Sequence, residues 1–244
     1  MVEALSHERN GGVTRGPFLS PDCLLLRMQA RALSTEQIKS DYVRNEIERM
    51  MRIARGEQEK EGAYLSQGRM VGVAHPQVAT KGDPLRIIVI DRSATGEPNG
   101  PVGGLAVFIN PVFVPNSKQV RFGRETCFSV DDRVSGFVPR FSDGTIFALD
   151  QTGNSLAFPV TGYQSVLFQH EIDHLDGYIF PDRILYPRHI MLRDKAPELY
   201  RKLRIAGKLQ TLQNPYPHRG NAMELNNLVM GRRYDASFMK RVLR

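Results

Sequence analysis

Apolar residues recur at every third or fourth position from residue 35 to residue 56. Because residues three or four apart share one face of an α-helix, this spacing predicts an amphipathic helix over that range. Ser34 precedes the helix and Gln37 follows three residues later, a pattern that caps helix N-termini. Residues 1–20 are polar and Gly-rich without periodicity, and we expect them to be disordered.

A different pattern begins near residue 85, where short runs rich in Val, Ile and Phe alternate with turn residues. Runs of this length and composition predict β-strands. The predicted strands cover residues 85–91, 104–110, 112–114, 118–122, 136–141, 145–150 and 157–160.

Gly162 and Gly177 bracket a further predicted helix, and residues 197–212 again have helical periodicity. The order of elements predicts an α+β fold, in which mostly antiparallel strands pack around this central helix and the N-terminal helix comes first. We expect residues 21–185 to form one catalytic domain and residues 186–244 to form a basic, partly helical C-terminal extension.

Positive charge is concentrated in the last quarter of the chain. The whole sequence has 33 basic and 26 acidic residues, whereas residues 185–244 contain 13 basic and 4 acidic ones. Such a tail is either a solvated surface or a binding site for an anionic partner, for which RNA or the ribosome is our expectation. No apolar run reaches the roughly eighteen residues of a membrane span. The two cysteines fit a reducing compartment, which favours the cytoplasm and leaves an organelle open.

The clearest chemical signal is the segment Gln169–Gly177, which reads Gln-His-Glu-Ile-Asp-His-Leu-Asp-Gly. His170 and His174 are four residues apart, so a helix presents both imidazoles to one cation. Glu171 follows the first histidine and can reach a water on that cation without ligating it. This HExxH pattern is typical of metal-dependent hydrolases.

Two histidines do not complete a metal site, and the identity of the third ligand stays open at this point. The metzincin class needs a histidine where this chain has Phe180, so that class is excluded. A zinc peptidase of another class takes a downstream glutamate, for which Glu198 is the candidate, with His189 as a weaker option. Cys127 lies upstream, in the strand region, and reaches the helix if its strand packs beneath it.

Three segments, in the same order along the chain, resemble the motifs of the peptide deformylase family. Residues 169–177 match the family pattern QHExDHLxG in full. Residues 125–129 resemble the pattern EGCLS with its Gly and Leu replaced, and residues 70–77 resemble GxGLAAxQ, whose first Gly and second Ala are among the replaced positions. The resemblance covers about residues 20–185 and implies the deformylase fold for that part of the chain.

This resemblance implies a metal-dependent amide hydrolase that removes the N-formyl group from the N-terminal methionine of newly made polypeptides and releases formate. The implied metal ligands are Cys127, His170 and His174, with Fe²⁺ the expected ion and Zn²⁺, Ni²⁺ or Co²⁺ as alternatives. Glu171 is the implied acid–base group, which takes a proton from an activated water and passes it to the leaving amine.

The resemblance also implies groups that stabilise the oxyanion formed during the reaction. These are the side-chain amide of Gln77 and the backbone N–H of Phe128, which does not depend on the side chain at that position. By the same resemblance, Gly72, the second glycine of the first motif, is counted among the catalytic residues.

We expect an apolar pocket for the methionine side chain of the substrate. Tyr163, Val166 and Leu167 precede His170 by seven, four and three residues, so they share its helix face. Val71 is expected to add to these walls, although all four fit an ordinary core equally well.

The chain departs from the family pattern close to the expected site. Met70 and Thr126 replace glycines, and His75 replaces an alanine. The β-branched Thr126 narrows the approach of a substrate backbone, which leads us to include it among the substrate-binding residues. An alternative hypothesis therefore stays open, in which a deformylase-like metal-binding protein has an altered substrate or a peptide- or ribosome-binding role.

Overall fold

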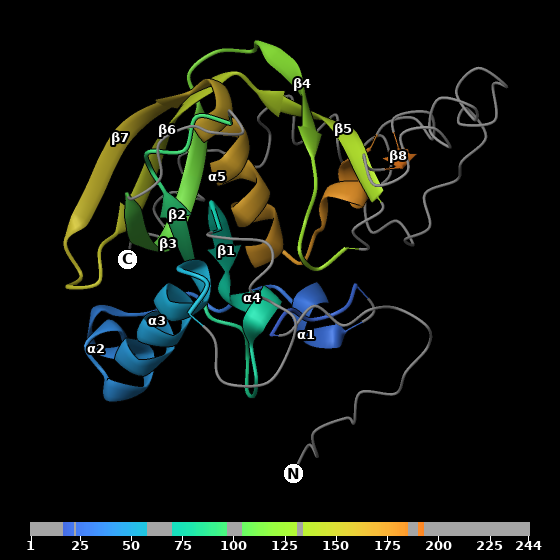
Figure 1. The fold of residues 1–244 in the computed structure, drawn as a ribbon. Coiled ribbons are helices and arrows are strands. Elements are labelled where there is room, and N and C mark those ends of the chain that lie inside the picture. The colour runs from blue at the N-terminus through green and yellow to red at the C-terminus, as the bar shows by residue number, and fades with distance from the viewer. Residues whose placement is uncertain are drawn as a thin grey trace, which may run out of the picture.

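The computed structural model of the 244-residue chain describes residues 17–21, 23–57, 70–96, 104–130, 134–184 and 190–192. The described part contains two antiparallel sheets and several helices (Figure 1), which fits the predicted α+β class. None of its helices combines the length and apolarity needed to cross a lipid bilayer.

The larger sheet has five strands in the order β1-β2-β3-β6-β7, and every neighbouring pair is antiparallel. Its strands are β1 (Gly72–Ala74), β2 (Ile87–Asp91), β3 (Leu105–Pro115), β6 (Asp143–Leu149) and β7 (Ser155–Thr161). The smaller antiparallel sheet has the order β4-β5-β8. Its strands are β4 (Val120–Glu125), β5 (Val134–Phe141) and β8 (Ile190–Leu192).

Helix α5 (Gly162–Leu175) carries the HExxH segment and contacts strands of both sheets, as Figure 1 shows. Phe168 and Ile172 pack in one apolar cluster with Ile88 and Phe108 of the larger sheet. Every residue from 165 to 175 is buried, so the polar side chains on this helix must find partners inside the protein.

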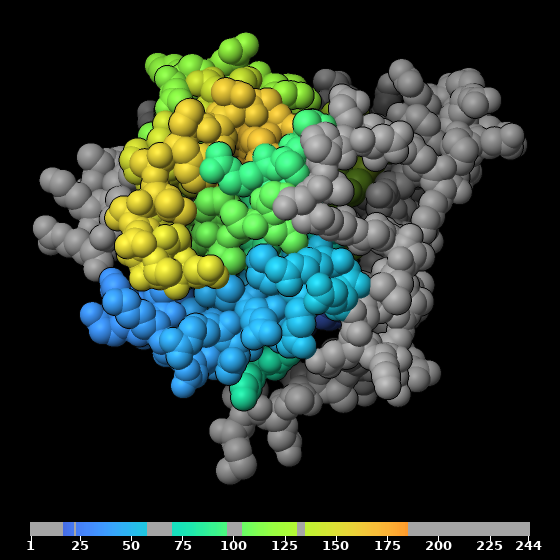
Figure 2. All heavy atoms as spheres, turned by 60° about the vertical axis from the view of Figure 1, so that its left-hand side comes forward, coloured from blue at the N-terminus to red at the C-terminus, as the bar shows by residue number. Residues whose placement is uncertain are grey.

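The predicted helix over 35–56 is wrong in one respect, because the structure divides it into α2 (Thr35–Ile38) and α3 (Asp41–Ala54). The division occurs at Ser40, whose hydroxyl donates to the Gln37 carbonyl at 2.6 Å and accepts from the Val43 amide at 3.4 Å. Serine competes for backbone groups in this way, ending one helix and capping the next. In Figure 2 the two helices cover one end of the molecule beside β6 and β7.

The predicted strands 104–110 and 112–114 form a single strand, β3, and their separation was wrong. The register of β3 against β6 shifts between Ile109 and Val112, where Asn110 has a φ of 50°. Asparagine tolerates this left-handed conformation, and its side chain bonds both the N–H and the C=O of Leu33. The chain thus bulges without leaving the sheet.

The bounds of the other predicted strands also differ from the structure by one to three residues. β4 begins at Val120 rather than 118 and continues to Glu125, which brings the chain to Cys127. The three-residue strand β1 was not predicted, because so short a run has no readable alternation.

The remaining helices are short. They are α1 (Leu24–Arg27), α4 (His75–Val78) and the 3₁₀ helix η2 (Phe180–Arg183). Phe18 is buried and Leu19 donates its N–H to the Gln77 carbonyl at 2.7 Å, so the predicted disorder of residues 1–20 does not hold for these two. The predicted helix 197–212 lies outside the described residues.

Candidate metal centre

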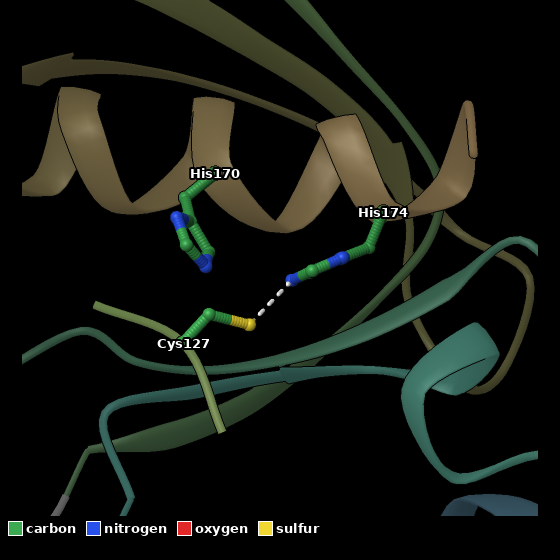
Figure 3. A group of neighbouring side chains, drawn as sticks. All are labelled: Cys127, His170 and His174. Atoms are coloured by element: carbon green, nitrogen blue, oxygen red, sulfur yellow. Dashed lines mark hydrogen bonds between the residues drawn. The ribbon is translucent and has the colours of Figure 1, made fainter. Parts of the chain in front are cut away.

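Helix α5 places His170 and His174 one turn apart, and both side chains point toward Cys127 on the segment that follows β4 (Figure 3). The three ligand atoms lie within 4.8 Å of one another, and the Cys127 Sγ is 3.3 Å from the His174 Nε2. All three residues are buried. One thiolate and two imidazoles suit a tetrahedral Zn²⁺ or a similar transition metal, so the residues present fit such an ion.

The structure brings Cys127 to the two histidines, as the resemblance implied. The alternative third ligands, Glu198 and His189, lie outside the described residues. Among the residues that the structure describes, Cys127, His170 and His174 form a group of three side chains that could hold a metal ion.

The ring of His170 is oriented by a carboxylate that was not predicted to touch it. Glu125, at the end of β4, bonds the Nδ1 of His170 at 2.7 Å, which turns the Nε2 toward the cation position. Burial alone would raise the pKa of Glu125, but Arg140 holds that pKa below its ordinary value. The Nε and Nη2 of Arg140 bond the two oxygens of Glu125 at 2.7 and 2.9 Å.

The same arginine links Glu125 to α5. Arg140 bonds Asp173 at 2.6 Å, and Arg183 of η2 bonds the other oxygen of Asp173 at 2.7 Å. Despite its burial, Asp173 has a pKa well below the ordinary range, because the two guanidinium groups favour its charged form. This paired network allows four buried charges to sit behind the candidate site. Glu125 is the first residue of the second motif, and that position is the sequence signal that pointed to it.

Glu171 lies against β1 and is 3% exposed. Burial raises the pKa of its carboxyl to about 7, and the nearby charge of Glu125 acts in the same direction, while His170 and Arg140 oppose it. Its Oε2 has no hydrogen-bond partner within the described residues. A buried carboxyl with a pKa near neutrality is suited to accept and return a proton.

Gly72 permits the close approach of β1 to this carboxyl. A Cβ at position 72 would lie 2.5 Å from the Glu171 Oε1 and 3.0 Å from the Leu167 Cδ1. Real Cβ contacts are longer than this, so any side chain here would displace Glu171 or Leu167.

Gln77 lies on α4, which contacts α5. Its Oε1 accepts the Ala74 N–H at 2.8 Å, which turns the Nε2 toward the Cys127 Sγ at 3.4 Å. Phe128 follows the cysteine, and its ring stacks on Phe18 with centroids 5.0 Å apart. A side-chain amide and a residue adjacent to the cysteine therefore flank the ligand set.

The expected pocket residues lie near α5 but not all in one place. Leu167 is buried in one apolar cluster, which Val71 and Tyr163 contact as partly buried neighbours. Val166 lies beside Gly123 of β4, where a Cβ would be 3.3 Å from its Cγ1. Thr126 is exposed.

A family model described as polypeptide deformylase matches residues 21–188. The chain belongs to this family. It is 40% identical over 116 residues to a peptide deformylase of Shouchella clausii, a match that covers 47% of this chain and 60% of the relative. Peptide deformylase 2 of a Nostoc species is 33% identical over 141 residues, covering 57% of this chain and 76% of the relative.

Solved structures of the family support the same conclusion for the fold. A class I type b peptide deformylase from Acinetobacter baumannii, solved with Met-Ala-Ser bound, superposes with a TM-score of 0.56 at 26% identity. That match covers 69% of this chain and 97% of the other. A deformylase from Synechococcus elongatus, solved in complex with actinonin, gives a TM-score of 0.52 at 26% identity.

Proposed function

We propose that this chain is a metal-dependent peptide deformylase, which hydrolyses the N-formyl group of N-formylmethionyl peptides on newly made polypeptides and releases formate. The observation that carries the proposal is the buried group of Cys127, His170 and His174 with the carboxyl of Glu171 beside it. The family membership and the Met-Ala-Ser bound to the Acinetobacter structure support this substrate class.

Cys127, His170 and His174 would hold one divalent cation, and the family resemblance favours Fe²⁺ over Zn²⁺, Ni²⁺ or Co²⁺. When bound, such a cation acts as a Lewis acid and lowers the pKa of a nearby water toward about 7. Glu125 fixes the His170 ring, so that the same nitrogen always faces the cation.

Glu171 is the proton carrier in this proposal. Its carboxylate accepts a proton from the attacking water, and the resulting acid donates that proton to the departing amine nitrogen. A carboxyl with a pKa near 7 can accept and donate a proton at neutral pH. A glutamate with its ordinary, lower pKa is a weaker base and accepts the proton less readily.

Gln77 and Phe128 stabilise the negative charge that develops on the formyl oxygen. The Gln77 Nε2 already points into the site, and its Oε1 is held by the backbone, so it needs no reorientation when the charge forms. The Phe128 N–H follows Cys127 directly and is the second donor. Gly72 leaves the space that the Glu171 carboxyl occupies beside β1.

For the methionine side chain we propose a pocket formed by Val71, Tyr163, Val166 and Leu167. Val71, Tyr163 and Leu167 would line it at one apolar cluster, and Val166 would extend it toward Gly123 of β4. Thr126, which is exposed and precedes Cys127, would contact the peptide backbone and set how closely the substrate approaches.

The proposal is tested by measuring formate release from formyl-Met-Ala-Ser under anaerobic conditions, with metal content determined on the same sample. We expect release that depends on the metal, and no product from the N-acetylated or unformylated peptide. Full metal occupancy without formate release would contradict the proposed activity.

We further propose that the basic C-terminal region docks the protein on the ribosome. Residues 193–244 contain 12 basic and 4 acidic residues. Deleting them should abolish most co-sedimentation with ribosomes at low salt and leave kcat on a short peptide unchanged, because the candidate site lies elsewhere. Co-sedimentation of the truncated protein at the wild-type level would refute this docking role.

A further inference from the structure

His75 stands where the family pattern has an alanine, in the one-turn helix α4 that also carries Gln77. We propose that His75, together with Glu46 and Arg49 of α3, is a positioning residue that sets the orientation of α4 and thereby the aim of the Gln77 amide. This inference rests on the proposed function, since it concerns the donor assigned to the formyl oxygen.

The imidazole of His75 is 1% exposed and bonds two elements at once. Its Nδ1 accepts the N–H of Leu85 at 3.1 Å, and its Nε2 lies 3.2 Å from the Glu46 Oε2. Because Nδ1 accepts a backbone N–H, the ring proton resides on Nε2 and is donated to the carboxylate. The ring therefore joins α4 to the segment that precedes β2 on one side and to α3 on the other.

Glu46 is held in its charged form at this contact. The hydrogen bond from His75 lowers the pKa of Glu46 to about 2, and Arg49 acts in the same direction against the effect of burial. Arg49 bonds the Glu46 Oε2 through both Nε, at 3.1 Å, and Nη2, at 2.6 Å. Such charge-assisted bonds are shorter and stronger than neutral ones, which makes this end of the contact stiff.

Arg49 also reaches the far end of α4. Its Nη2 donates to the Val78 carbonyl at 2.8 Å, so the first and last residues of α4 are tied to the same face of α3. A helix of one turn has little stability of its own, and its orientation must come from contacts of this kind. The Leu19 N–H, which bonds the Gln77 carbonyl at 2.7 Å, adds a third attachment.

A change in the orientation of α4 would move Gln77 and would leave the proposed metal ligands in place. The Gln77 Oε1 is bonded to the backbone N–H of Ala74, immediately before α4, so its Nε2 moves with this helix. Cys127, His170 and His174 belong to other elements. Loosening the contact of α4 with α3 should therefore weaken stabilisation of the oxyanion without loss of metal, and misplacement by about 1 Å can cost roughly 100-fold in rate.

Two substitutions at position 75 separate the two bonds of the ring. His75→Gln places an amide donor where Nε2 stood and keeps the bond to Glu46, whereas His75→Asn keeps an acceptor for the Leu85 N–H and is too short to reach Glu46. We expect His75→Asn to lower kcat for formate release by about 10- to 100-fold, with KM within about twofold and full metal content. His75→Gln should recover most of the lost kcat.

Arg49→Met is expected to reproduce the His75→Asn defect, and Arg52→Met, an exposed arginine on the same helix, is the matched control that should leave kcat unchanged. All kinetic constants are measured per metal-loaded, folded protein, with Tm recorded for each variant. Equal kcat for His75→Asn and His75→Gln, or a fall in Tm with unchanged kcat, would overturn the positioning role.

A second readout separates this inference from the proposed function. The side-chain ¹⁵N amide resonance of Gln77 should shift or broaden in His75→Asn and match the wild type in His75→Gln, whether or not the wild type releases formate. If the wild type releases no formate, the proposed function fails while this resonance still reports on the contact. An unchanged Gln77 resonance in His75→Asn refutes the inference by itself.

Discussion

Cys127→Ala is expected to lose most of its bound metal and, as a result, at least about 1,000-fold in kcat for formate release. The cysteine is one of the three buried residues proposed as ligands, and the proposed reaction depends on the cation that they would hold. Because replacing even an outer partner of a ligand weakens metal affinity by about 10- to 100-fold, removing the ligand itself should cost more. Competition with a chelator measures that affinity directly.

Cys23→Ala is the matched control for this experiment. Cys23 is the other cysteine of the chain and is partly buried. Its replacement should leave metal content and kcat at the wild-type level. Glu198→Ala distinguishes the peptidase arrangement, in which the downstream glutamate is the third ligand. Retained metal in Cys127→Ala together with loss in Glu198→Ala would overturn the ligand assignment.

Glu171→Gln is expected to lower kcat by about 100- to 10,000-fold and to leave the metal in place. Glutamine keeps the size of the buried side chain but cannot accept the proton from the attacking water. The expected loss matches the rate factor that general acid–base groups commonly contribute. The variant also avoids burying a new charge, so the free energy of unfolding should change little. The measurement combines steady-state formate release with metal analysis of the same preparation.

Glu48→Gln, an exposed change on α3, serves as the control and should behave as the wild type. Formate release by Glu171→Gln within about tenfold of the wild-type rate would show that another group carries the proton. If this variant loses formate release yet performs the cellular role of the wild type, the alternative of a deformylase-like binding protein is favoured instead.

Local patterns in the sequence predicted those elements whose backbone conformation depends on side chains close together in the sequence. The spacing of His170 and His174 predicted that they share one face of a helix, and the structure brings both to Cys127. The capping pair Ser34 and Gln37 likewise predicted the start of a helix, and the structure shows both of their reciprocal bonds. These features depend on neighbours within about one helical turn, which the sequence displays directly.

The errors arose where distant contacts determine the backbone. Asn110 continues β3 through a bulge because its side chain bonds Leu33, 77 positions away, and no local pattern contains that partner. The predicted helix over 35–56 is divided because the Ser40 hydroxyl bonds the turns on both sides of it. The spacing of apolar residues contains no information about such a bond.

In the candidate metal centre, some features follow from the local sequence and others depend on tertiary contacts. By itself, the sequence determined the HExxH helix, the acid–base candidate within it and the order of the three motifs. Only the tertiary structure decided that Glu125 orients His170, that Gly72 admits Glu171 to the site, and that His75 connects α4 to α3. The physical reason is that each of these contacts joins residues separated by about thirty positions or more, whose approach depends on how whole elements pack.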